Sequence, residues 1–223
     1  EDSPINQQVE IAAGEALVKF EVAIPSPRLW TLDDPYLYEV EATLDNEKVK
    51  SYFGMRKISV ENLPGTDYPY IALNDQPVYM QLALDQSYHP DGYYTFPSDA
   101  FMKEEILRSK SIGLNGIRPH IKVEIPRKLY WADKLGLLVM QDLPNSWGEP
   151  DAKMKAESEY TLREMIKRDY NHPAIFSWIV FNETWGLFTK VGEAEDGKPI
   201  RSYLPETQDW VASMYYLAKS LDQ

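Results

Sequence analysis

The chain has 223 residues, 43% of them hydrophobic, so it is long enough to bury a core and to hold one domain plus part of another. Its 35 acidic residues outnumber its 23 basic ones, and the net charge of −12 would repel a phosphate backbone, which argues against nucleic acid as a partner. No apolar run approaches the roughly 20 residues that span a bilayer, so we expect no membrane partner, and the absence of cysteine excludes disulfides and thiolate chemistry while leaving the compartment open.

The first 62 residues have the period-two pattern of β-strands. Apolar and polar side chains alternate over residues 18–24 and again over 38–44, and a turn at Asp45 precedes an apolar stretch at 49–53. We expect three or four antiparallel strands of a β-sandwich with one face in water. Such a sandwich takes about 100 residues, so residues 1–62 would form only its C-terminal part.

A polar segment with proline and glycine at 61–67 separates this region from one in which strands and helices alternate. We take residues 63–223 as the second domain, and residues 79–85 are predicted to be its first strand. A helix over 99–112 follows, for which Ser98 is the expected N-cap and Gly113 the stop.

The same unit then repeats along the chain. Pro126 should open a second helix, because its missing N–H is not needed at the first helical position, and Gly136 should end it. The remaining expected elements are strands at 115–118, 137–142 and from 175 onward, and helices at 152–170 and 206–221. Four βα units are half of an eight-unit (β/α)8 barrel, which takes about 250 residues.

The apolar run that starts at Ile175 is typical of a strand buried on both faces, and it leads directly into Asn182 and Glu183. Together with the preceding segment 168–173, and with segments 29–38 and 53–58 in the first region, it resembles family 2 of the glycoside hydrolases, the β-galactosidase, β-glucuronidase and β-mannosidase family. The resemblance implies a partial TIM barrel preceded by part of the immunoglobulin-like domain, and a carbohydrate substrate.

The resemblance also implies a catalytic residue. Retaining glycosidases use two carboxyl groups, one that protonates the leaving oxygen and one that attacks the anomeric carbon. Glu183 matches the family's acid/base glutamate, and Asn182 matches the asparagine that contacts the sugar 2-hydroxyl. The alternative for Glu183 is a capping or salt-bridge glutamate.

Further substrate-binding candidates follow the other predicted strands. Arg118 matches the family arginine that contacts the catalytic carboxylates, and its alternative is a structural ion pair. His120 follows this arginine by two residues where many members have three, so a hydrogen-bonded loop histidine is an equal alternative. Asp85 and Asp142 end the first and third strands, where a sugar hydroxyl would reach them, and Trp185 lies two residues after Glu183.

We expect no metal and no other cofactor. Many family members have an Asp-Glu pair where this chain has Asp142 followed by Leu143, which argues against a β-galactosidase-like metal site. Phosphate-binding and dinucleotide motifs are also missing.

Two functions remain open. The first is a retaining, exo-acting β-glycosidase whose nucleophile lies beyond residue 223; the second is an inactive carbohydrate-binding or assembly fragment. The sugar stays undetermined, because the family's substrates differ by single substituents. In a half barrel, Val78, Met80, Ile179 and Val180 on the outermost strands would lack neighbours, so we expect self-association.

Overall fold

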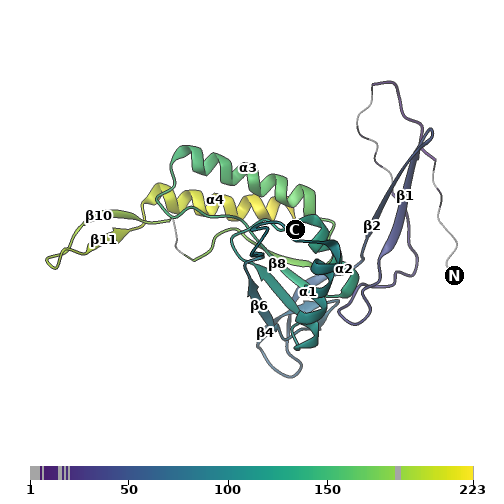
Figure 1. Ribbon diagram of the computed structural model, residues 1–223, viewed down its shortest axis with the longest axis horizontal. Helices are drawn as coiled ribbons and strands as arrows, with labels where there is room; N and C mark the ends of the chain where they lie inside the picture. The colour runs from purple at the N-terminus through teal and green to yellow at the C-terminus, as the bar shows by residue number, and fades with distance from the viewer. Residues whose placement is uncertain are drawn as a thin grey trace.

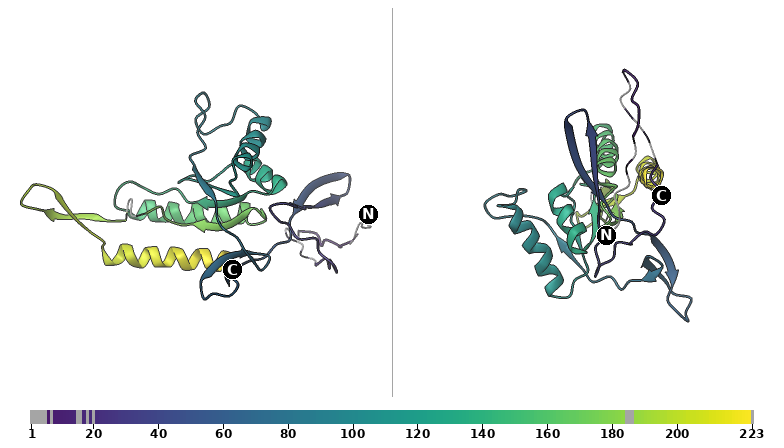
Figure 2. Two further views of the ribbon diagram at one scale, coloured as in Figure 1. Left: turned by 90° about the horizontal axis from the view of Figure 1, so that it is seen from below. Right: turned by 90° about the vertical axis from the view of Figure 1, so that its right-hand side faces the viewer.

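A computed structural model describes residues 6, 8–14, 17, 19, 21–183 and 187–222 of the chain. It is a mixed α/β structure with one parallel sheet, three antiparallel sheets and four α-helices among the described residues. The parallel sheet and the helices form the body of the molecule, and two β-hairpins extend from opposite ends of it (Figure 1). Figure 2 shows the same arrangement from two further directions.

The parallel sheet has the strand order β6-β7-β8-β9, which is also the order along the chain. Its strands are β6 (Leu82–Asp85), β7 (Gly116–Pro119), β8 (Leu138–Asp142) and β9 (Ile175–Ile179). Each connection between neighbouring strands contains one helix, as parallel pairing requires. The four carboxyl ends therefore lie along one edge of the sheet, as the sequence predicted.

The helices begin and end close to the residues that the sequence indicated. They are α1 (Asp99–Ser111), α2 (Pro126–Leu135), α3 (Ala152–Asp169) and α4 (Pro205–Leu221). The Ser98 hydroxyl accepts a hydrogen bond from the amide of Phe101 and so caps α1. Gly136 ends α2 with φ of 73°, a left-handed conformation that costs glycine little.

Two hydrophobic clusters hold the body together. The first lies between the sheet and helices α1 and α2, and includes Ile106, Leu129 and Leu138, all at most 1% exposed. The second joins α3 and α4 to the ends of β8 and β9, with Leu162 and Met214 at its centre. Helices α3 and α4 lie side by side in Figures 1 and 2. Burial of this apolar surface is the main stabilising contribution to the sheet that carries the site.

The antiparallel part differs from the expected sandwich. Strands β1 (Tyr38–Leu44) and β2 (Glu47–Phe53) form the predicted hairpin, but nearly all of it is exposed on both faces, so the expectation of one buried face is wrong. The strand expected over 18–24 is also wrong for its described residues 19 and 21–24, which belong to no strand. Residues 18 and 20 lie outside the described part.

Two further sheets were not expected. The polar segment 61–67 contains the last two residues of β3 (Ile58–Asn62) and most of the turn that leads to β4 (Pro69–Leu73). Strands β3 and β4 pair with each other, and β4 also pairs with β5 (Gln76–Pro77). Strands β10 (Thr189–Glu193) and β11 (Pro199–Ser202) form a second exposed hairpin after β9.

A buried aspartate connects the first region to the sheet. The Asp133 carboxylate in α2 accepts hydrogen bonds from the Tyr52 hydroxyl (2.8 Å) and from the Ala174 amide (2.9 Å), and it contacts His172 Nδ1 at 2.5 Å. Its backbone carbonyl accepts a 2.7 Å bond from the indole of Trp30. Burial and the neighbouring Asp133 raise the pKa of Tyr52, so its hydroxyl remains a donor.

The expected exposure of the outermost strands is also wrong in part. Val78 and Met80 are partly buried against the first cluster, and Val180 packs against the second. These three side chains therefore have neighbours. No helix in the described ranges is long and apolar enough to cross a membrane.

Candidate active site

Four of the predicted residues meet at the carboxyl ends of β7, β8 and β9, namely Arg118, His120, Asp142 and Asn182. Arg118, in β7, binds the Asp142 carboxylate at the end of β8 through Nε and Nη2, both at 2.9 Å. Asp142 is fully buried, and it also accepts a 2.9 Å bond from the amide of Ile121. Three N–H groups therefore satisfy this carboxylate, which binds Arg118 and has no exposed oxygen for a sugar hydroxyl.

The bound guanidinium in turn holds Asn182. Arg118 Nη2 donates to Asn182 Oδ1 at 2.9 Å, and His120 Nε2 lies 3.2 Å from the same oxygen. The backbone amide of Asn182 donates to Asn145 Oδ1 at 2.6 Å. Asn182 is 6% exposed, so residues that follow two other strands fix both its side chain and its backbone.

Glu183 follows this fixed residue directly. Its side chain is exposed, and its backbone has a φ of 53°, in the left-handed region that non-glycine residues seldom adopt. Ser87 after β6 and Ile121 after β7 share this conformation, with φ of 52° and 47°. Strained backbones of this kind cluster at functional sites, where the surroundings hold them. Trp185, the remaining predicted substrate contact, lies outside the described residues.

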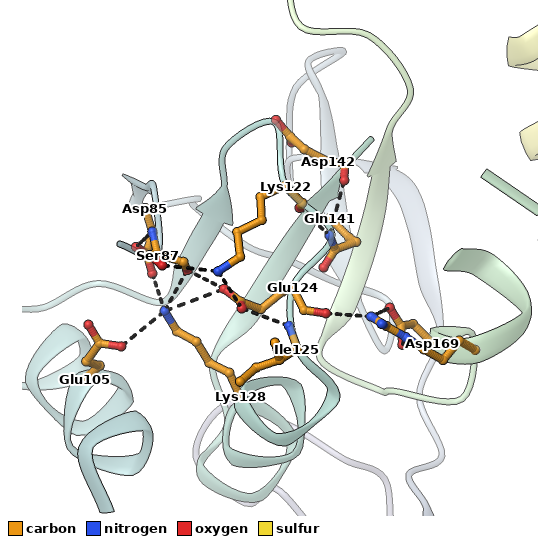
Figure 3. A network of polar contacts seen from close by, with 11 residues as sticks. Asp85, Ser87, Glu105, Lys122, Glu124, Ile125, Lys128, Gln141, Asp142 and Asp169 are labelled. Carbon is orange, nitrogen blue, oxygen red and sulfur yellow. Dashed lines mark hydrogen bonds and ion pairs between the residues drawn. The ribbon is translucent and has the colours of Figure 1, made fainter. Parts of the chain in front are cut away.

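Asp85 lies at the end of β6 and takes part in a different network. Its Oδ2 forms a 2.6 Å ion pair with Lys128, and its Oδ1 accepts a 2.7 Å bond from the Ser87 amide. Lys128 is 1% exposed and also contacts Glu124 and Glu105 (Figure 3). The Asp85 side chain therefore does not join the Arg118 group. Its carboxylate instead neutralises the buried Lys128.

The carboxylates of this network stabilise the positive charge of Lys128. Burial lowers the pKa of Lys128, but the carboxylates of Asp85, Glu124 and Glu105 outweigh burial and raise it above the ordinary value. Burial raises the pKa of Glu105, and the nearby lysine offsets this only in part. Lys128 therefore stays charged and is a structural cation rather than a base.

Several residues of this edge were not identified from the sequence. Gln86 follows β6 by one residue and its Nε2 lies 3.0 Å from His120 Nδ1, and Asn145 follows β8 by three residues. Both would have been found by examining every amide within three residues of a strand end. Lys128 and Glu124 gave no such signal, because charged residues are normally exposed.

The remaining histidines lie away from this group. His172 lies in the Asp133 network before β9, at the opposite end of the strand from Glu183, and the ring of His89 packs edge-on against Phe101. Within the described residues no group of three or more histidine, aspartate or glutamate side chains is arranged to hold a metal ion.

Comparisons with known proteins agree with this architecture. The sequence model of "Glycosyl hydrolases family 2" matches residues 2–56. The β-galactosidase of Thermoanaerobacter pseudethanolicus is 28% identical over 160 residues, which are 71% of this chain and 21% of that protein. A putative β-glucuronidase of Formosa agariphila is 29% identical over 188 residues, 78% of this chain and 17% of that protein.

A solved structure has the same fold. The family 2 β-galacturonidase of Eisenbergiella tayi, bound to galacturonate, superposes with a TM-score of 0.71 at 24% identity, covering 92% of this chain and 33% of that one. The chain spans about a fifth of the length of the curated relatives that it matches. These matches show that the chain is similar, in sequence and in fold, to members of glycoside hydrolase family 2 over most of its length.

Proposed function

We propose that the chain is part of a retaining, exo-acting β-glycosidase in which Glu183 is the acid/base residue. The observation that carries this proposal is the bonding of Asn182, which Arg118 and the Asn145 side chain hold in place beside Glu183 at the end of β9. A fixed amide next to a carboxyl group can bind a sugar hydroxyl while the carboxyl group protonates the leaving oxygen. The β-galactosidase and β-glucuronidase relatives support the same reaction class.

We further propose that the parallel sheet is the first half of a (β/α)8 barrel over residues 63–223, and that residues 1–62 belong to an immunoglobulin-like domain. The one-helix connections and the sequential strand order support the barrel. In this arrangement the remaining strands would carry the nucleophile, beyond residue 223.

The charge pairing at the sheet edge supports a nucleophile outside the chain. Arg118 occupies Asp142, and Lys128 occupies Asp85. A carboxylate held by a cation in this way is a weak nucleophile, because the ion pair stabilises its charge. Neither residue is therefore a good partner for Glu183 in a double displacement.

The pairing of Asp142 and Asp85 with cations also favours the second function for the isolated 223 residues. In that case they form a carbohydrate-binding or assembly fragment without turnover. The purified chain should then hydrolyse no aryl glycoside, since Glu183 alone forms no glycosyl-enzyme intermediate. Turnover that survives removal of contaminating enzymes would contradict this.

The acid/base role is tested in the full-length enzyme with Glu183→Gln and a graded series of aryl glycosides. Substrates with poor leaving groups need protonation, so their kcat/KM should fall by about 10² to 10⁴, whereas activated aryl glycosides should lose far less. Azide should restore turnover of the activated substrates by replacing the water that Glu183 would activate. The control is Glu195→Gln in the β10–β11 turn, which should change neither class. An equal loss across the series without azide rescue would remove the assignment.

A further inference from the structure

The hydrogen-bond chain around His120 defines which atom of each amide faces inward. The Arg118 guanidinium has donors but no acceptor, so the Asn182 atom 2.9 Å away must be the oxygen. His120 Nε2 lies 3.2 Å from that same oxygen and must therefore carry a proton. The Asn182 amide NH2 is left as the group that can donate to another molecule.

The other ring nitrogen of His120 contacts the side chain of Gln86. In a neutral imidazole with a proton on Nε2, Nδ1 is an acceptor. The atom 3.0 Å from Nδ1 is Gln86 Nε2, a donor. We propose that Gln86 is a positioning residue, which selects the Nε2–H tautomer of His120 and thereby gives the Asn182 oxygen a second donor beside Arg118, so that the Asn182 amide is held more firmly with its NH2 toward the substrate. Its effect on catalysis rests on the proposed glycosidase function, whereas its effect on the tautomer does not.

The backbone beside Gln86 is held unusually firmly. Its neighbour Ser87 has a left-handed φ of 52° and is 3% exposed. The Ser87 amide donates to Asp85, its hydroxyl donates to Glu124, and its carbonyl accepts from Lys122 at 3.2 Å. Lys128 in α2 also donates to the Ser87 hydroxyl, at 3.0 Å, and Figure 3 shows these contacts converging on Ser87. The buried charges thus fix the turn from which the Gln86 side chain extends.

A second contact aligns the two loops. The backbone amide of His120 donates to the Asp85 carbonyl at 2.8 Å, which fixes the backbone of His120 against the residue that precedes Gln86. This bond holds the imidazole within reach of the Gln86 amide, since the two backbones cannot separate without breaking it. The side-chain bond at Nδ1 then selects the tautomer within a geometry that the backbone already sets, because the partner of one imidazole nitrogen decides where the proton lies.

The tautomer itself is measured by ¹⁵N NMR of the imidazole nitrogens in the 223-residue chain, which has three histidines. The His120 signals are identified by their loss in His120→Ala. In the wild type we expect a protonated Nε2 and a bare Nδ1. Gln86→Leu removes the donor and should give a mixture of the two tautomers, while Gln86→Glu replaces the donor by an acceptor and should move a proton onto Nδ1.

The matched control is Gln208→Leu in α4, which removes an equivalent exposed amide that donates to the Tyr203 carbonyl at 3.2 Å. It should leave the His120 signals unchanged. A wild type with the proton on Nδ1, or a tautomer that does not respond to Gln86→Leu, would overturn the proposal.

The catalytic consequence is tested in the full-length enzyme with two substrates, an aryl glycoside and its 2-deoxy analogue. If Gln86 acts through Asn182 on the sugar 2-hydroxyl, Gln86→Leu should lower kcat/KM about 10-fold for the first substrate, the loss of one hydrogen bond of about 1.4 kcal/mol. It should leave the 2-deoxy substrate unchanged, because the contact is already missing. Equal losses on both substrates would overturn the proposed route. An enzyme that hydrolyses neither substrate would contradict the glycosidase function, and the NMR result would still decide the tautomer.

Discussion

The parallel sheet and the two exposed hairpins contain strands of similar length but depend on different interactions. Three of the four residues of β7 are buried, whereas all four residues of β11 are exposed. Helices cover the parallel strands, while β1–β2 and β10–β11 each form a separate two-stranded sheet. Isolated hairpins are marginally stable in water. The comparison indicates that the parallel sheet carries the cooperative stability of the chain, and that the hairpins contribute little to it.

The largest difference in unfolding free energy between the parallel sheet and the hairpins should come from substitution of a lysine in each. Lys128→Met leaves Asp85 without its cation and leaves Glu124 with Lys122 alone, and breaking a buried ion pair in this way typically costs about 3–5 kcal/mol. Lys190→Met in β10 breaks an exposed pair with Glu193 and should change nothing measurable. Urea unfolding of the purified chain compares the two variants. Similar stability in both would mean that the buried network is not needed for the fold.

A somewhat smaller contrast is expected for apolar side chains. Leu138→Ala in β8 should lower the free energy of unfolding by about 3 kcal/mol, because it leaves a cavity in the first cluster. Val49→Ala in β2 should stay within about 0.5 kcal/mol, because that side chain is 65% exposed. The same urea titrations measure both. A comparable loss at Val49 would show that something covers the β1–β2 hairpin in solution.

Two left-handed glycines extend the contrast to the backbone. Gly136→Ala would place a methyl group well inside van der Waals contact with the Leu32 carbonyl oxygen, in addition to the left-handed cost of about 1–2 kcal/mol. Gly197→Ala, in the β10–β11 turn, meets no atom within 4 Å, so it should show at most the backbone cost. If melting curves gave equal shifts for the two variants, the contact with Leu32 would be unimportant.

The smallest effect concerns pH. Burial raises the pKa of Glu105 in the folded chain above the ordinary value of 4.5. The folded state therefore keeps this proton to higher pH than the unfolded state, so its contribution to stability falls as the pH rises past about 4.5 and through the folded pKa. Glu105→Gln should flatten this part of the stability curve, whereas Glu104→Gln, on the exposed side of α1, should not. Parallel slopes for wild type and Glu105→Gln over about pH 4 to 7 would contradict the expectation.

Sequence reasoning succeeded where a local signal determines the structure. The helix boundaries at Ser98, Pro126 and Gly136 follow from the conformational preferences of single residues, and the parallel strands follow from long apolar runs. It failed for residues 19 and 21–24, because alternation alone does not supply a neighbouring strand. Strand pairing depends on residues distant in the chain, which the pattern does not contain.

The candidate site was predictable to a similar extent. The family resemblance, together with their places at strand ends, indicated Arg118, Asn182 and Glu183 as site residues, and the structure brings Arg118 and Asn182 into contact. The pairing of Arg118 with Asp142, and of Asp85 with Lys128, could not be read from the sequence. Each carboxylate could have met either cation, and only the packing of α2 against α1 and β8, which places Lys128, decides between them.

The contacts of Asp133 have a consequence for the order of folding. The bond from Trp30 to the Asp133 carbonyl joins residues 103 apart in the chain, and the bond from Tyr52 spans 81 residues. Contacts within one βα unit, such as the bond from Gln81 to Asn115, span only 34. Closing a longer loop costs more entropy, and non-local contacts slow folding. The βα units should therefore assemble first, and the segment from Trp30 to Tyr52 should attach to a sheet that has already formed.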